Sequence, residues 1–121
     1  MRKTSDILWQ DAQHQVLFEI LDLISEPGAD RQVFKKLKDY AENHFYLEEC
    51  YMEALDYPGF AEHKAAHNGF RQEVEGLLTA DAMVDDQYMD LIGTYLTEWL
   101  TRHVFGTDKK LEGFILQSGT K

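Results

Sequence analysis

The chain has a single cysteine, Cys50, among its 121 residues, which excludes any disulfide within it. We therefore expect a protein of a reducing compartment rather than one of the small secreted folds that disulfides hold together. The length allows a buried core, and we expect one domain over residues 1–121. No apolar run approaches the roughly 20 residues that span a bilayer, and the N-terminal MRKTSDILWQ lacks the apolar stretch of a signal peptide. The predicted location is the cytoplasm, with no membrane partner.

Positive charge is also scarce in the sequence. Lys plus Arg number 12 against 22 Asp plus Glu, which gives a formal net charge of −10. A surface that acidic repels phosphate backbones and anionic lipid, so nucleic acid is not an expected partner. Solubility alone accounts for this charge, and we assign it no further role.

Proline occurs at only two positions, and both lie where a helix would have to end. Pro27 lies in SEPGAD and Pro58 in DYPGF, while a third break, TADAMVDD, has the Thr and Asp composition of a loop and a helix N-cap. Between the breaks, apolar residues recur at steps of three and four, the periodicity of one face of an α-helix. The sequence therefore predicts helices over about 11–25, 31–56, 60–79 and 85–105. Short connections make neighbours antiparallel, so we expect an all-α, up-down-up-down four-helix bundle with a short C-terminal helical tail.

The apolar faces of these helices also carry side chains that bind metals. All five histidines fall at helical spacings and two carboxylates accompany them, as His14, His44-x-x-x-Glu48, His63-x-x-x-His67 and His103-x-x-x-x-Asp108. Residues four apart lie on one helical face, so each such pair can bind one centre. A lone histidine on such a face is more often a core residue bonded to a carbonyl. Six of the seven side chains lie on the apolar faces themselves, namely His14, His44, Glu48, His63, His67 and His103. Burying these six without partners would cost a few kcal/mol each against a total stability of roughly 5–15 kcal/mol, which favours a metal centre.

The kinds of ligand restrict the metal. Imidazole with carboxylate and without thiolate suits iron, zinc, copper or manganese. Two carboxylates supply too few oxygens for calcium or magnesium. Five imidazoles and two carboxylates that can bridge are too many ligands for one ion and about right for two.

Four stretches together resemble the hemerythrin family, specifically its single-domain bacterial form. They are DAQH at His14, HFYLEE from His44, YPGFAEHKAAH through His67 and WLTRHVFGTD through Asp108, and they span nearly the whole chain. The resemblance implies two non-haem iron ions, joined by an oxo or hydroxo bridge, that bind dioxygen reversibly. The family pattern then assigns the ligands in three sets: His63, His67 and His103 on one iron, His14 and His44 on the other, and Glu48 and Asp108 bridging both.

The two irons would differ in their free positions. The three-histidine iron would have six ligands and the other five, and an open position is what separates a reactive metal from a closed structural one. Dioxygen is therefore expected at the iron of His14 and His44. Leu17, Phe18 and Trp99, each about one turn from a ligand, are candidates for the wall of an apolar pocket there, although ordinary core packing explains each equally well.

Three other positions carry expectations of their own. Asp11 either caps the first helix, which we favour, or bonds to His14, and Glu49, about 100° off the buried face, should be solvated. The five-residue step from His103 to Asp108 leaves them about 140° apart on an ideal helix. Both reach one centre only if the backbone departs from α geometry, and Gly106, which has free φ/ψ choice, is the expected place for a π-bulge, a kink or a helix end.

Three classes of function remain open at this point. The resemblance favours a dioxygen-binding protein for storage, delivery or scavenging. A sensory domain that acts on a fused or partner signalling module would have the same ligands. An enzyme that handles peroxide or nitric oxide is less favoured, because oxygen-activating bundle sites use Glu-x-x-His pairs and none occurs in this sequence. We therefore expect a binding protein and not an enzyme.

Overall fold

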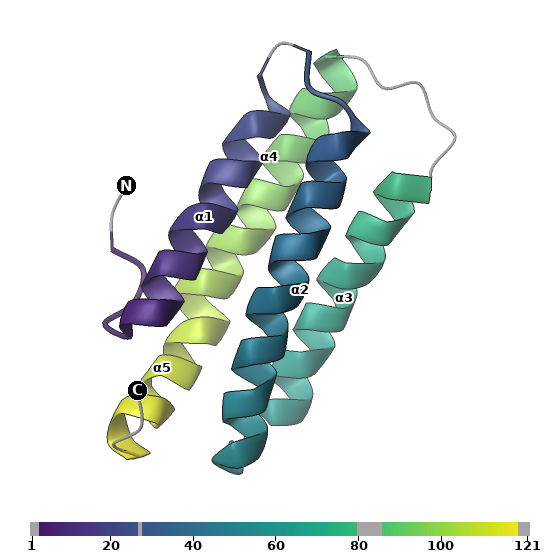
Figure 1. Ribbon diagram of the computed structural model, residues 1–121. Helices are drawn as coiled ribbons and strands as arrows, with labels where there is room; N and C mark the ends of the chain where they lie inside the picture. The colour runs from purple at the N-terminus through teal and green to yellow at the C-terminus, as the bar shows by residue number, and fades with distance from the viewer. Residues whose placement is uncertain (1–2, 27, 80–85, 119–121) are drawn as a thin grey trace.

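The computed structural model describes residues 3–26, 28–79 and 86–118, and it is helical throughout apart from the N-terminal arm and the connections. Figure 1 shows α1 to α4 packed side by side, with α5 prolonging α4. The predicted all-α four-helix bundle with a C-terminal helical tail is confirmed. The elements are α1 (Leu8–Ile24), α2 (Arg31–Ala54), α3 (Phe60–Thr79), α4 (Asp86–Arg102), a π turn (His103–Thr107) and α5 (Asp108–Ser118).

The first and last residues of the helices lie close to the predicted ones, with one exception. Gly28 (φ 83°) and Asp56 (φ 52°) turn the chain in the first two connections, and Asp30 caps α2 by accepting a hydrogen bond from the Gln32 N–H at 2.9 Å. The exception is α1, which begins about one turn earlier than expected and so brings Gln10 onto its buried face. Pro27 and residues 80–85 of the third break lie outside the described residues.

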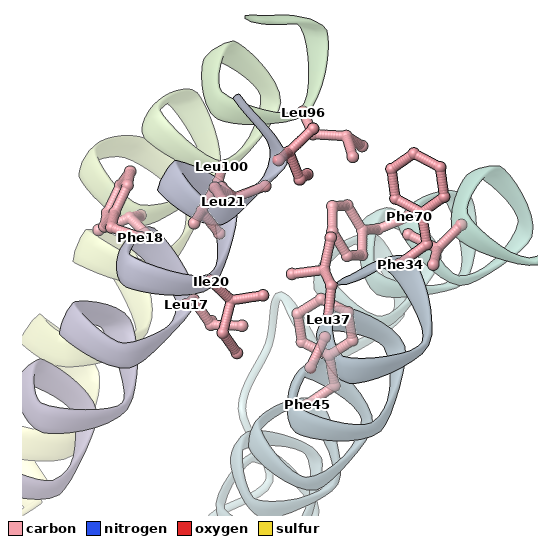
Figure 2. Packing of buried hydrophobic residues seen from close by; sticks show 14 of the residues in the cluster. Leu17, Phe18, Ile20, Leu21, Phe34, Leu37, Phe45, Phe70, Leu96 and Leu100 are labelled. Atoms are coloured by element: carbon pink, nitrogen blue, oxygen red, sulfur yellow. The ribbon is translucent and has the colours of Figure 1, made fainter. Parts of the chain in front are cut away.

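Two apolar clusters fill the bundle, one on each side of a polar layer. The larger cluster joins α1, α2, α3 and α4, and Figure 2 shows how its side chains converge between the helices. The smaller one consists of Ile7, Met52, Leu111 and Ile115. The candidate ligands of each helix lie in the sequence between members of the two clusters. Since each fully buried aliphatic or aromatic side chain contributes about 1.5–3 kcal/mol, the apolar packing holds the polar layer in place from both ends.

The chain departs from α geometry between His103 and Asp108, as the sequence predicts. The N–H of Asp108 donates to the carbonyl of His103, which is the five-residue bond of a π turn. The turn brings Asp108 back over His103, and its Oδ1 lies 3.0 Å from His103 Nε2. Gly106 lies within this turn, as predicted, but it does not use a positive φ there, because Gly28 is the one glycine with positive φ among the described residues. One inserted residue makes this turn, and a glycine is not required for it.

Replacing Gly106 with alanine should therefore leave the fold and the metal content unchanged, because an added Cβ would meet nothing within 4 Å. Deleting Gly106 should remove the inserted residue, leave a regular α-helix and place the aspartate four residues after His103 on the same helical face, so the metal should again be retained. Elemental analysis and thermal unfolding measure both variants. Metal loss in the Gly106→Ala variant would show that the glycine itself is needed.

Candidate metal centre

Seven polar side chains meet in the polar layer, and none is more than 4% exposed. They come from α1, α2, α3, the π turn and α5, and they are all the ligands that the sequence predicts. The structure brings them together in two overlapping groups, within each of which the ligand atoms lie within 4.8 Å of one another. The first group is Glu48, His63, His67, His103 and Asp108, and the second is His14, His44, Glu48 and Asp108.

Glu48 turns one carboxylate oxygen toward each group. Its Oε1 lies 3.1 Å from His67 Nε2 and 3.4 Å from His63 Nε2. Its Oε2 lies 3.5 Å from His44 Nε2. This division between the two oxygens is the arrangement of a carboxylate that can bridge two cations.

Asp108 divides its oxygens in the same way. Its Oδ1 lies 2.9 Å from His63 Nε2 and 3.0 Å from His103 Nε2, and its Oδ2 lies 2.9 Å from His14 Nε2. Two ligand atoms that are each about 2.1 Å from a metal, and at right angles around it, lie about 3.0 Å apart. The separations therefore fit ligands that share a coordination sphere.

The atoms that face the centre of the layer have no hydrogen-bond partner among the described residues. They are buried donors and acceptors, namely Nε2 of all five histidines, Glu48 Oε1 and both oxygens of Asp108. A buried polar group left unsatisfied costs about 1–3 kcal/mol, so this set together would cost as much as the whole stability of an ordinary domain. A cation in each group would satisfy all of these atoms. Imidazole nitrogens and carboxylate oxygens are donors that suit a cation.

The charges in the layer also favour a bound cation. Burial lowers the pKa of His44 to about 4, so its imidazole stays in the neutral form that binds metals. Burial would lower the pKa of His63 too, but Asp108 and Glu48 overcome it and raise that pKa to about 9. Despite complete burial, the facing imidazoles hold the pKa of Asp108 well below its usual value. The layer therefore contains ionised carboxylates that attract positive charge.

The N-terminal arm orients His14 through a residue that the sequence analysis did not single out. Thr4 Oγ1 lies 3.0 Å from His14 Nδ1, and both the hydroxyl and the N–H of Thr4 donate to Asp11 Oδ1 at 2.7 Å. Both roles predicted for Asp11 are wrong, because α1 has no side-chain cap at Ile7 and Asp11 reaches the imidazole only through Thr4. A hydrogen bond of this kind fixes the orientation of the ring.

Two glutamines of α1 also contact the layer. Gln13 Oε1 lies 2.6 Å from His44 Nδ1, and Gln10 donates from Nε2 to Glu48 Oε2 at 2.8 Å. Ser5 holds the other end of the Gln10 amide with a 2.7 Å hydrogen bond. Gln10 was missed because the helix was expected to begin at residue 11, although its position four residues before His14 was a usable signal.

Glu49 is not solvated, contrary to the prediction. Its Oε2 accepts hydrogen bonds from His67 Nδ1 at 2.9 Å and from Arg71 at 3.0 Å, and its side chain is only 13% exposed. Burial would raise the pKa of Glu49, but the bonds from Arg71 and His67 lower it. Glu49 points away from the buried face that carries Glu48, and for that reason we predicted that it faces solvent. The same offset instead directs its side chain toward α3.

Trp99 lies against the three-histidine group. Its ring stacks on His103 with centroids 4.7 Å apart and planes 12° apart, and it also packs on Phe70. The prediction that Trp99 walls a pocket over His14 and His44 is therefore wrong. Trp99 lies one turn before His103 on the same helix. It therefore covers the group to which His103 belongs.

Other apolar side chains pack around the ligands. Phe45, which the sequence analysis did not single out, stacks on His67 with centroids 3.9 Å apart. Leu17 and Phe18, predicted to line the open position, are 1% and 7% exposed and belong to the larger apolar cluster. Their part in a ligand pocket stays a prediction.

Most of the chain matches a single protein family. The family model of the hemerythrin HHE cation binding domain covers residues 6–115. The chain belongs to the hemerythrin family. This confirms the resemblance that the four sequence stretches indicate.

Relatives of the chain include proteins named hemerythrin, bacteriohemerythrin and hemerythrin-like protein. The chain is 33% identical over 106 residues to a hemerythrin of Themiste dyscrita, covering 87% of this chain and 81% of that one. It is 29% identical over 111 residues to a bacteriohemerythrin of Clostridium acetobutylicum, covering 83% and 86%. It is 27% identical over 104 residues to a hemerythrin-like protein of Naegleria gruberi, covering 85% and 80%.

In this hemerythrin-family chain the buried layer is a metal site. The cation binding in the family's description agrees with the unpartnered donors that face each other there. Among the described residues, no helix is both long and apolar enough to cross a membrane.

Proposed function

We propose that the chain binds dioxygen reversibly at a non-haem diiron centre. The observation that carries the proposal is the unequal division of ligands between the two groups, since three imidazoles face one and two face the other while the same two carboxylates reach both. A solvent-derived oxo or hydroxo bridge would give one iron six ligands and the other five. The relatives named hemerythrin, myohemerythrin and bacteriohemerythrin support the same function.

The proposal gives each ligand a role. His63, His67 and His103 would hold one iron, His14 and His44 would hold the other, and Glu48 and Asp108, which reach both groups, would be shared between them. The irons, when bound, supply the electrons that reversible dioxygen binding needs. The chain fixes the imidazoles of His14, His44 and His67 through their Nδ1 partners. It excludes water with the larger apolar cluster, in which Leu17 and Phe18 are proposed to line the open position.

The ligand set also supports a binding protein rather than an enzyme. Oxygen-activating bundle sites take Glu-x-x-His pairs, whereas this site takes five histidines and has no such pair. A sensory role, a fused or partner signalling module and a cytoplasmic location stay predictions.

Anaerobic reduction followed by addition of oxygen tests the proposed function. Purified protein should contain two irons per chain, one for each ligand group. A visible absorption band should appear with oxygen, vanish when oxygen is removed, and return over repeated cycles. One zinc per chain, or a band that decays and does not return, would contradict the proposal.

A further inference from the structure

The ligand histidines differ in the chemistry of the group that holds their outer nitrogen. His14 Nδ1 contacts the hydroxyl of Thr4 at 3.0 Å, and His44 Nδ1 contacts the side-chain amide of Gln13 at 2.6 Å. His67 Nδ1 instead meets a carboxylate, Glu49 Oε2, at 2.9 Å. The two imidazoles of the second group thus have neutral partners, and the first group contains one with an anionic partner.

Arg71 fixes Glu49 in this position. Its Nη1 donates to Glu49 Oε2 at 3.0 Å and its Nη2 to Oε1 at 3.3 Å, so both carboxylate oxygens are held. The same guanidinium is anchored by Glu42, at 2.8 Å from Nε and 3.1 Å from Nη2. The paired donors of a guanidinium match a carboxylate in geometry, which gives Glu49 one defined orientation.

The ring of His67 is also held by its face. Phe45 stacks on it with ring planes 12° apart, and Arg71 lies over the same phenyl ring at 5.3 Å from its centroid. A hydrogen bond at the ring edge and a stack on the ring face together define its plane. The Nε2 lone pair of His67 is therefore directed at the first group, beside Glu48 Oε1 at 3.1 Å.

We propose that Glu49, held by Arg71, is a positioning residue that orients His67 and makes it the stronger electron donor, so that the iron of His63, His67 and His103 is the harder of the two to reduce. The inference rests on the proposed function. A hydrogen bond from an imidazole N–H to a carboxylate increases the basicity of the ligating nitrogen. Stronger donation stabilises the higher charge of the metal and lowers its reduction potential.

Reduction potentials of the iron-loaded Glu49→Gln protein test the proposal. The amide keeps an acceptor for His67 but removes the charge, so the lower of the two one-electron potentials should rise by about 59 mV, which corresponds to a tenfold change in the equilibrium constant. The higher potential should change by only a small fraction of that shift. Glu42→Gln is the matched control, because it removes one charge from the same Arg71 network without touching His67, and it should shift neither potential comparably.

The reciprocal variant, Gln13→Glu, gives His44 an anionic partner. It should lower the higher potential and leave the lower one unchanged. This shift is opposite in sign to that of Glu49→Gln and occurs at the other iron. Both potentials shifting equally in Glu49→Gln, or shifting as much in Glu42→Gln, would show a general charge effect and overturn the proposal.

A measurement on zinc-loaded protein separates this proposal from the proposed function. The proton on His67 Nδ1 should resonate far downfield in NMR spectra and move upfield in Glu49→Gln but not in Glu42→Gln. Unchanged potentials and an unchanged proton in Glu49→Gln would overturn the role of Glu49, even where iron content and reversible oxygen binding are intact. Failure of wild-type protein to bind oxygen would instead contradict the proposed function, while the zinc spectrum still decides whether Glu49 orients His67.

Discussion

Replacing His67 with alanine is expected to lower the iron content from two per chain, one for each ligand group, to one or fewer. His67 and His63 share one face of α3 and one ligand group, so neither can take over the role of the other. The loss also leaves Glu48 Oε1 without its nearest imidazole, at 3.1 Å. Because binding of a metal by the folded state adds to its stability, thermal unfolding should shift to lower temperature as well.

Elemental analysis and thermal unfolding of His67→Ala and His63→Ala check this expectation. Lys64→Ala is a suitable control, because the side chain is exposed on the same helix and its loss should change neither result. Acidification should also release the metal, since an imidazole must be neutral to ligate. Full retention of metal by both histidine variants would contradict the assignment of the three-histidine group.

Alanine at Leu17 is expected to shorten the life of the oxygenated form without changing the iron content. Leu17 lies about one turn beyond His14, is 1% exposed and contacts no metal in the proposed scheme. Truncation leaves a cavity, costs about 2–5 kcal/mol of stability and admits water near the open position. We expect decay to the oxidised form to accelerate roughly tenfold, which corresponds to about 1.4 kcal/mol of barrier.

Val74→Ala is the matched control for Leu17→Ala. Val74 is also 1% exposed in the larger apolar cluster, but it lies on α3 beyond the three-histidine group. Its truncation should lower stability and alter the decay much less. Decay rates are followed by the visible spectrum under air. Equal decay in Leu17→Ala and wild type, or faster decay in Val74→Ala, would mean that oxygen binds at the other iron.

Helical periodicity is a property of each segment by itself, and it was enough to predict the bundle and its polar layer. His44 with Glu48 and His63 with His67 repeat at four residues, so each pair lies on one face wherever its helix is placed. The polar residues lie on the apolar faces, and the apolar faces must meet in the core. The same reasoning from spacing predicted a break in α geometry before Asp108.

Only the packing of one helix against another decided what surrounds the ligands. Glu49 lies off the buried face of α2, yet α3 brings His67 and Arg71 to it. Trp99 covers His103 and not the position over His14. Periodicity determines the direction in which a side chain points from the axis of its own helix. The partner that it meets depends on how the neighbouring helix is rotated about its axis and shifted along it. The sequence therefore determined the residues of the metal layer, and the tertiary structure determined which groups hold and tune them.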